Sequence, residues 1–241
     1  MLLRARQVSK AFDGFTAVAK ATVEVDTGEI IGIIGPNGAG KSTFFNCLAG
    51  ETAPTAGTIH FNGVDVTYAP PEVHARLGMA RTYQVPATFE DLTILDNVAI
   101  GAFLRHPRRA QAEQAAMRVL EQTGLAPVSH LRAGTLGTPG RKRLEIARAL
   151  ATEPRLMLLD EALAGLAPVE IQRAIELVRE IHKAGVTLII VEHLMEVIFT
   201  LAQRVIVFHH GEVIAAGAPE DVKSDARVIA AYLGQRAGSR T

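Results

Sequence analysis

The sequence predicts an α/β fold, in which a strand-rich beginning is followed by a helical middle part and then by alternating helices and strands. Three observations predict it. Strand-like runs fill residues 1–34, apolar residues recur at helical spacing between 91 and 124, and short apolar strands alternate with helices after residue 155. A chain of 241 residues can bury the core of one such domain together with a smaller subdomain.

The N-terminal part is predicted to be rich in strands. Ala21–Val25 is one strand-like run, and Glu29–Ile34 is a short apolar run of the type found in strands buried on both faces. Residues 58–61 and 64–67 flank the pair Asn62-Gly63, which favours the tight turn of a β-hairpin. We therefore expect an antiparallel subdomain before the main parallel strands.

The rest of the chain alternates between helical and strand patterns. Residues 91–124 are expected to be mostly helical. Helices are predicted at 110–123, 141–151 and 169–183, and strands at 156–159, 187–191, 205–208 and 212–216. The last two strands form a hairpin around Gly211, and the order as a whole indicates an α/β core with a helical insert.

Charge and aromatic content argue against a nucleic-acid partner. Lysine and arginine together number 25, as do aspartate and glutamate, so the chain has no net field that would attract DNA or anionic lipid. Aromatic residues make up only 5% of the sequence and tryptophan is absent, which does not favour a base-stacking surface. We expect no nucleic-acid binding.

Hydropathy and cysteine content indicate a cytoplasmic protein. No segment approaches the roughly 20 uninterrupted apolar residues of a membrane-spanning helix. Residues 1–6 lack the apolar stretch of a signal peptide. The single cysteine, Cys47, excludes an internal disulfide and is expected to be a buried structural thiol. Any role at a membrane must then come through partner subunits.

The most specific motif occupies residues 35–43. It reads Gly-Pro-Asn-Gly-Ala-Gly-Lys-Ser-Thr and matches G-x-x-x-x-G-K-[ST], the loop whose backbone N–H groups surround a triphosphate. A chance match in a chain of this length has a probability of about 1%, and the strand before it and the helix after it lower that figure. The predicted nucleotide-binding residues are Gly35, Pro36, Asn37, Gly38, Ala39, Gly40, Lys41, Ser42 and Thr43.

Each polar side chain of this loop has an expected task. Lys41 supplies a positive charge to the β- and γ-phosphates of ATP, and the Ser42 hydroxyl faces Mg²⁺. The helix expected from Lys41 to about Ala49 adds the partial positive charge of its N-terminus beneath the phosphates.

A second motif ends the predicted strand at 156–159 with two adjacent carboxylates, Asp160 and Glu161. The carboxyl ends of parallel strands face the ligand crevice of an α/β sheet, so Asp160 is expected to hold Mg²⁺ and Glu161 to polarise a water against the γ-phosphate. A strand ending in Asp-Glu is weak evidence by itself, because carboxylates often simply end strands. The phosphate loop upstream makes it strong.

These two motifs, with what lies between and after them, resemble the nucleotide-binding subunit of ABC transporters over nearly the whole chain. The resemblance implies a P-loop NTPase core (the ABC ATPase fold) with an N-terminal antiparallel β subdomain and a helical insert. It implies a single nucleotide-binding domain over 1–241, in which 1–85 and 155–241 form the catalytic core lobe. Residues 86–154 then form the helical subdomain.

The resemblance also implies roles for three further residues. Gln84 takes the place of the family's glutamine that contacts Mg²⁺ and the attacking water and couples the site to the membrane subunits. His193 stands where the family has a histidine that contacts the γ-phosphate, and Phe12 where an aromatic ring stacks on adenine. Taken singly, each has a plainer interpretation as a solvated or core residue. The functional interpretation is favoured because six family features occur in the family's order along the chain.

Within ABC proteins the details resemble the ATPase subunits of branched-chain amino acid importers, and the larger of their two ATPase types. The supporting stretches are residues 44–46, 78–84, 92–98, 143–150, 191–193 and 228–234. The resemblance implies a second ABC ATPase subunit, two transmembrane permease subunits and a periplasmic solute-binding protein as partners. It places the chain on the inner face of the membrane, with the helical insert docked on a permease loop. Homodimer and heterodimer both stay open.

The resemblance breaks at the signature, which in the family reads Leu-Ser-Gly-Gly-Gln. Here residues 136–140 read Leu-Gly-Thr-Pro-Gly, so Gly137 lacks the serine hydroxyl and Pro139 lacks a backbone N–H. Ala162 replaces the proline that usually follows the catalytic glutamate in the family, and Ala167 replaces a polar residue further on. These changes predict weaker contact with the partner's nucleotide and an asymmetric pair of sites. The alternative is that the remaining amides and helix dipole suffice.

Two other functions remain open from the sequence. The altered signature is compatible with a subunit that binds nucleotide and regulates a competent partner with little hydrolysis of its own, although the intact Glu161 and His193 argue against it. A soluble ABC ATPase of DNA repair or translation is the third possibility. Such proteins usually carry tandem cassettes, coiled-coil insertions or basic surfaces, which this sequence lacks.

Overall fold

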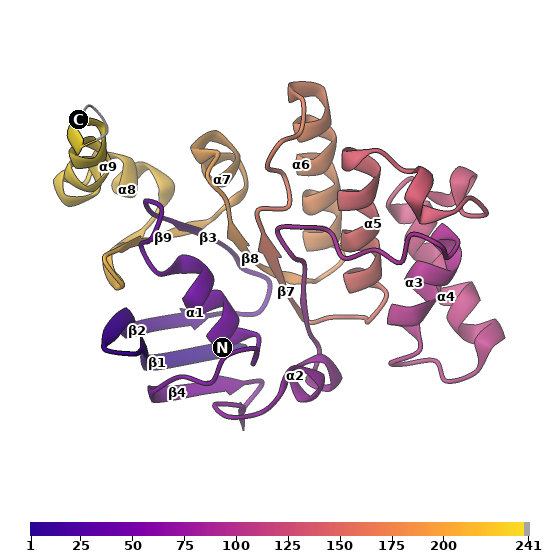
Figure 1. The fold of residues 1–241 in the computed structure, drawn as a ribbon, viewed down its shortest axis with the longest axis horizontal. Helices are drawn as coiled ribbons and strands as arrows, with labels where there is room; N and C mark the ends of the chain where they lie inside the picture. Colours follow the sequence, from indigo (N-terminus) through magenta and orange to yellow (C-terminus); the bar gives the residue numbers. More distant parts are fainter. Residues whose placement is uncertain (239–241) are drawn as a thin grey trace. The chain divides into compact units, whose positions relative to one another are not determined.

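The computed structural model describes residues 1–238, with side chains described through residue 232. The chain divides into two compact units. The first combines Met1–Leu77 with the chain from Thr187 onward, and the second comprises Gly78–Val186. Both mix helices and strands (Figure 1), which confirms the predicted α/β class.

The first unit contains an antiparallel sheet in the order β2-β1-β4-β5. Its strands are β1 (Leu3–Phe12), β2 (Phe15–Val25), β4 (Ala56–Phe61) and β5 (Val64–Asp65). Asn62 and Gly63 have φ values of 50° and 80°, so the predicted hairpin turn is present. β5 is shorter than the predicted strand at 64–67, because Thr67 instead bonds the Asp65 carboxylate through its hydroxyl at 2.5 Å.

The first unit also holds parallel strands. β3 (Ile30–Ile34) pairs in parallel with both β8 (Thr187–Val191) and β9 (Arg204–His209), and β9 pairs with the antiparallel β10 (Glu212–Gly217). All five residues of β3 and of β8 are buried, as expected for apolar strands covered on both faces. These strands carry the phosphate loop, which follows β3 directly.

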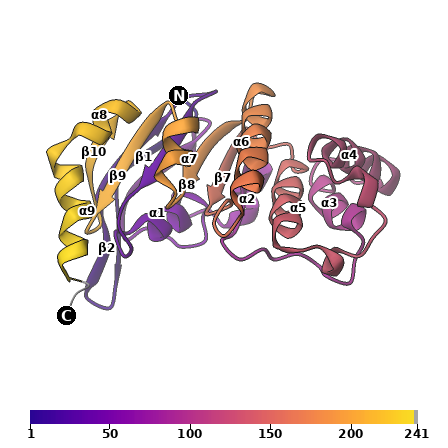
Figure 2. The ribbon, with the colours of Figure 1, turned by 90° about the horizontal axis from the view of Figure 1, so that it is seen from above.

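Five helices belong to the described part of the first unit: α1 (Lys41–Leu48), α2 (Pro71–Leu77), α7 (Met195–Leu201), α8 (Pro219–Ser224) and α9 (Ala226–Gly238). Figure 2 shows α8 and α9 packed along the β9–β10 hairpin. Cys47 on α1 is buried and free, as predicted, and burial raises the pKa of its thiol to about 11.

The second unit pairs the short strand β6 (Met79–Arg81) in parallel with β7 (Leu156–Asp160). Its helices are α3 (Ile94–Ala102), α4 (Arg109–Gln122), α5 (Thr138–Leu150) and α6 (Pro168–Lys183), with two 3₁₀ turns at Ala126–Val128 and Ala133–Thr135. Apolar residues of α3, α4 and α5 form one buried cluster. The division into a core lobe and a helical subdomain at 86 and 154 stays a prediction.

Several elements differ from the sequence expectation. α5 begins at Thr138 rather than at 141, because Pro139 fits the first helical turn, where its missing N–H is no loss to the helix. β6, α2, α7, α8 and α9 were not predicted, since most are shorter than two helical turns or a typical strand.

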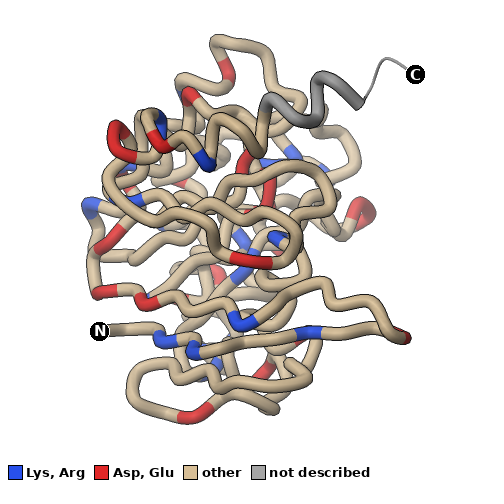
Figure 3. Tube along the Cα trace, turned by 90° about the vertical axis from the view of Figure 1, so that its left-hand side faces the viewer, with Lys and Arg blue, Asp and Glu red and all other residues tan. Residues whose placement is uncertain are grey.

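The described surface carries both signs of charge. Figure 3 shows acidic and basic residues interspersed along the trace, in keeping with 25 residues of each sign in the sequence. Among residues 1–238, no helix has the length and hydropathy required to cross a bilayer.

Candidate nucleotide site

The phosphate loop between β3 and α1 needs glycine at two positions. Gly35 has φ of 152° and a Cβ there would lie 2.2 Å from the Phe208 carbonyl oxygen. Gly40 has φ of 97°, and its Cβ would lie 2.3 Å from the Ala17 carbonyl oxygen. Both values exclude any side chain without backbone movement. Glycine at these two positions therefore lets the loop backbone pack directly against β9 and β2.

This packing predicts the outcome of two matched substitutions. Gly38 also has a left-handed φ, 76°, but a Cβ there meets nothing within 4 Å. We expect Gly38→Ala to lower the free energy of unfolding by about 1–2 kcal/mol through backbone strain alone. Gly40→Ala adds a steric clash and is expected to lower it by about 3 kcal/mol or more. Urea unfolding monitored by circular dichroism measures both, and equal losses would contradict the packing account.

Lys41 is directed into the phosphate loop. Its side chain is buried, and Nζ donates to the Gly35 carbonyl at 2.6 Å and to the Pro36 carbonyl at 3.0 Å. These bonds pre-position the ammonium group beside the loop amides. Ser42, the next residue of α1, is exposed, so its hydroxyl is accessible to a metal ion.

The carboxyl end of β7 holds the acidic pair. Asp160 is 5% exposed, and its Oδ2 accepts a hydrogen bond from Arg81 at 2.7 Å. Gln84 donates through Nε2 to Glu161 Oε2 at 2.8 Å, so the structure brings together two residues that the sequence places 77 positions apart. Lys142 Nζ donates to the Glu161 carbonyl at 2.8 Å. Hydrogen bonds thus hold both the carboxylate and the backbone carbonyl of Glu161.

Glu161 has an unusual backbone conformation. Its φ is 46°, in the left-handed region that non-glycine residues rarely adopt. The residue is also buried, with 8% of its surface exposed. Such strain persists only where the surroundings fix it, here through Gln84 and Lys142. In this conformation the Glu161 carboxylate lies within hydrogen-bond distance of Gln84.

The remaining predicted site residues lie in the first unit. Phe12 is at the tip of the β1–β2 hairpin, where its ring is 47% exposed and Lys10 Nζ lies 4.9 Å from the ring centroid. An exposed ring beside a cation suits stacking with a nucleobase. His193 follows β8 by two residues and is exposed to solvent. The structure leaves both side chains accessible, which the predicted contacts with adenine and the γ-phosphate require.

The altered signature begins α5. Gly137 caps the helix with φ of −69° and ψ of 172°, which any residue can adopt, and no side chain caps this end. Pro139 lies in the first turn, so one N–H is missing from it. A Cβ at Gly140 would come within 3.0 Å of Leu136, which accounts for glycine there.

Sequence reasoning missed three charged residues that hold the acidic pair and its glutamine. Arg81 bonds Asp160, Lys142 bonds the Glu161 backbone, and Glu145 accepts the Tyr83 N–H at 2.7 Å. A usable signal was present. Lys142 and Glu145 lie on the side of the amphipathic helix 141–151 that is otherwise apolar, and buried charges are rarely there without a partner.

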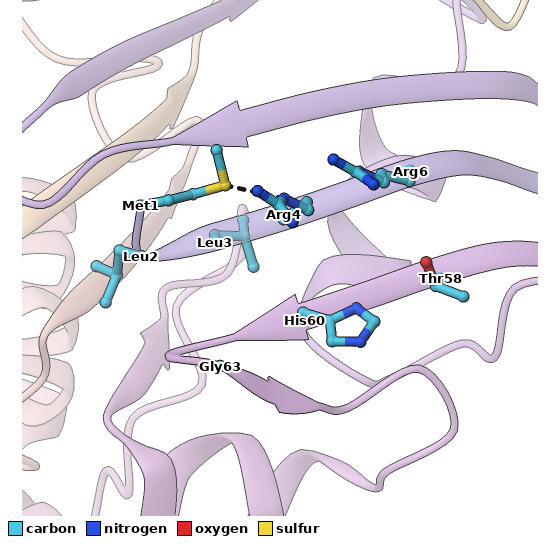
Figure 4. A pocket seen from close by; sticks show the side chains of 8 residues that line it. All are labelled: Met1, Leu2, Leu3, Arg4, Arg6, Thr58, His60 and Gly63. Carbon is cyan, nitrogen blue, oxygen red and sulfur yellow. Dashed lines mark hydrogen bonds between the residues drawn. The ribbon is translucent and has the colours of Figure 1, made fainter.

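Two cavities are found among the described residues of the first unit. One, of about 450 Å³, lies on the antiparallel sheet beside Arg4, Arg6 and His60 (Figure 4). Glu24 Oε1 is 3.2 Å from Arg4 and 3.6 Å from Arg6, so these charges are already compensated.

The second cavity, of about 410 Å³, is lined by the phosphate loop, the β9–β10 turn and α9. Tyr232 of α9 reaches the same loop. Burial raises the pKa of its phenol to about 12, and the facing Gly35 N–H opposes the rise. The C-terminal helix therefore packs against the phosphate loop.

Comparisons with known proteins agree with these features. The sequence profile of the ABC transporter family matches residues 18–164, and that of the branched-chain amino acid ATP-binding cassette transporters matches residues 212–238. The chain is 36% identical to the high-affinity branched-chain amino acid transport ATP-binding protein LivG of Salmonella typhimurium, over 97% of this chain and 98% of the relative. It is 32% identical to BraF of Pseudomonas aeruginosa over 97% and 98%.

A solved structure is similar over almost its full length. The ADP conformation of MJ1267, an ATP-binding cassette of an ABC transporter, superimposes with a TM-score of 0.88 at 30% identity, covering 97% of this chain and 98% of that one. The fold is that of an ABC ATPase cassette, with an antiparallel N-terminal sheet and parallel core strands. The chain belongs to the ATP-binding proteins of ABC transporters, in the branched-chain amino acid ATP-binding cassette family.

Proposed function

We propose that this chain hydrolyses ATP and drives a membrane importer for branched-chain amino acids or similar small polar solutes. The observation that carries the hydrolysis is the hydrogen bond between Gln84 and Glu161, 2.8 Å long, at a strained and buried carboxylate. A carboxylate held in place at the end of β7, as Glu161 is, suits a group that orients water. The similarity to LivG and BraF supports the solute class.

The chain's own residues divide the work. Lys41 and the amides of the phosphate loop bind the β- and γ-phosphates, with the N-terminus of α1 adding partial positive charge. Phe12 stacks on adenine. Glu161 accepts the proton of the attacking water or fixes its orientation, Gln84 holds Glu161, and His193 contacts the γ-phosphate. Such positioning and charge stabilisation account for most of the catalysis of phosphoryl transfer.

A magnesium ion fits the oxygen donors that these motifs offer. The Ser42 hydroxyl, the Asp160 carboxylate and the Gln84 side-chain oxygen are hard ligands of the kind that Mg²⁺ prefers, and they would hold it together with substrate phosphates. When bound, it would neutralise phosphate charge. Arg81 would orient Asp160 for this, since it bonds Oδ2 of that carboxylate.

Membership of the family supports a particular assembly. We propose that the chain pairs with a second ABC ATPase subunit beneath two transmembrane permease subunits, at the inner face of the cell membrane, and that a periplasmic solute-binding protein delivers the solute. The helical subdomain would dock on a permease loop. The test is phosphate release from Mg-ATP by the transporter reconstituted in vesicles, with and without solute-loaded binding protein. A rate that the loaded binding protein does not change would count against the transport function.

A second candidate is favoured by the signature residues Gly137 and Pro139, which offer no hydroxyl and one N–H fewer to a partner's nucleotide. In this alternative the chain mainly binds nucleotide and regulates its partner. Hydrolysis confined to this chain's own site, against a partner's complete signature, is the asymmetric form that we favour. Phosphate release by a heterodimer whose partner lacks its own catalytic glutamate separates the two, because only the asymmetric motor retains turnover.

A further inference from the structure

One face of α5 contacts the segment that carries Gln84 at two points and the backbone of Glu161 at a third. Lys142, Glu145 and Arg148 follow one another at three-residue intervals, so they form a stripe on one side of the helix. The stripe contains one anion between two cations. The partners of these three side chains named below all lie within the second unit.

The first two contacts reach the residues on either side of the Gln84–Glu161 bond. Lys142 Nζ donates to the Glu161 carbonyl at 2.8 Å, and Glu145 Oε1 accepts the Tyr83 N–H at 2.7 Å. Tyr83 directly precedes Gln84, so fixing its amide fixes the backbone from which the glutamine side chain extends. A buried carboxylate accepting an N–H at this distance forms a strong, charge-assisted bond.

The third contact holds the far end of the same segment. The Arg148 guanidinium lies 4.8 Å from the Phe89 ring centroid and also donates to the Ala87 carbonyl. The segment from Tyr83 to Phe89 is thus attached to α5 at both ends. Since α5 starts at the altered signature, these contacts join the signature helix to the segment that carries Gln84.

We propose that Glu145 is a positioning residue for ATP hydrolysis, which holds Tyr83 and thereby sets the geometry of Gln84 against Glu161. This inference rests on the proposed hydrolytic function only for its kinetic consequence. The structural part, that Glu145 fixes the Tyr83 amide, stands without any turnover.

The cost of burying this carboxylate supplies an independent signature. Glu145 is 6% exposed, and burial raises its pKa to about 7, while the Tyr83 N–H and the charges of Arg148, Lys142 and Arg81 oppose the rise. Because the pKa of Glu145 is higher in the folded chain than its ordinary value, protonation of this carboxyl stabilises the fold. This stabilisation is complete below about pH 4.5 and is lost as the pH rises through about 7. Glu145→Gln removes this titration, so the free energy of unfolding should depend less on pH between about 4.5 and 7.

The decisive experiment measures amide hydrogen exchange at Tyr83 in the full chain. We expect Glu145→Ala to accelerate exchange there by about tenfold or more, because the charge-assisted bond is lost, and Glu145→Gln, which keeps an acceptor oxygen, to accelerate it by about threefold or less. Glu176→Ala, at an exposed position of α6, is the matched control and should change nothing. Unchanged exchange at Tyr83 in Glu145→Ala, or equal acceleration throughout the second unit, would overturn the proposal.

A fluorescent reporter covers the case in which Glu145→Ala does not fold. The chain contains no tryptophan, so Tyr83→Trp introduces a single one at a side chain that is 47% exposed. We expect its emission to change with a midpoint near pH 7, and the change to disappear when Glu145→Gln is added. A change that persists in the double variant would contradict the assignment.

Kinetics then test the catalytic consequence separately. In the reconstituted transporter, Glu145→Ala should lower kcat by about tenfold with the KM for ATP within about twofold, since positioning acts on the transition state and not on phosphate binding. Glu145→Gln should restore kcat to within about threefold of the wild type. An unaltered kcat beside altered exchange would refute the positioning role, whereas absent turnover in the wild type would refute only the proposed function.

Discussion

Glu161→Gln is expected to reduce the rate of ATP hydrolysis by about 100-fold or more while ATP binding is retained. The substitution keeps the size of the side chain and a hydrogen-bonding oxygen for Gln84, which now bonds Oε2 at 2.8 Å. It removes the carboxylate that would orient water or take its proton. Phosphate release and equilibrium binding of a fluorescent ATP analogue, measured on the same preparation, separate the two effects.

The buried, strained position of Glu161 requires a control for folding. Circular dichroism and urea unfolding should match the wild type closely, because the backbone bond from Lys142 to the Glu161 carbonyl is untouched. Glu176→Gln on the exposed side of α6 is the matched substitution and should hydrolyse ATP normally. Turnover near the wild-type rate in Glu161→Gln, including in a heterodimer with a normal partner, would mean that the active site does not use this residue.

Lys41→Ala should abolish measurable ATP binding. Lys41 is the only side chain of the phosphate loop with a positive charge, and its ammonium is already directed at the loop by bonds of 2.6 and 3.0 Å. Removing two or more charge-assisted contacts with phosphate oxygens should weaken affinity by about 100-fold or more. Isothermal titration with Mg-ATP measures this directly.

The matching control for this variant is Lys183→Ala, an exposed lysine at the end of α6. It changes net charge by the same amount and should leave affinity unchanged. An equal loss in both variants would indicate a general electrostatic effect, and equal binding by Lys41→Ala and the wild type would exclude residues 35–43 as the phosphate site.

Local motifs were predictable from the sequence because their geometry is set within a few residues. The phosphate-loop motif requires positive φ and close backbone approach at its glycines, and Gly35 and Gly40 show both. The hairpin at Asn62-Gly63 and the buried strand β3 follow equally local rules. The fold class and the family were identified for the same reason.

Contacts between distant segments were not predictable. Glu145 and Tyr83 are 62 positions apart, and nothing in either neighbourhood indicates that one accepts the other's N–H. The left-handed conformation of Glu161 is likewise imposed by Gln84 and Lys142 rather than by its own propensity. Short elements such as β6 were not predicted, because three residues are too few to show a periodic pattern.

The most direct test identifies the nucleotide that each variant retains after incubation with Mg-ATP and the partner subunit. We expect ADP with the wild type, intact ATP with Glu161→Gln, and neither with Lys41→Ala. The same ratio of ATP to ADP in the wild type and in Glu161→Gln would show that phosphate capture near residue 41 and water activation near residue 161 do not serve one reaction.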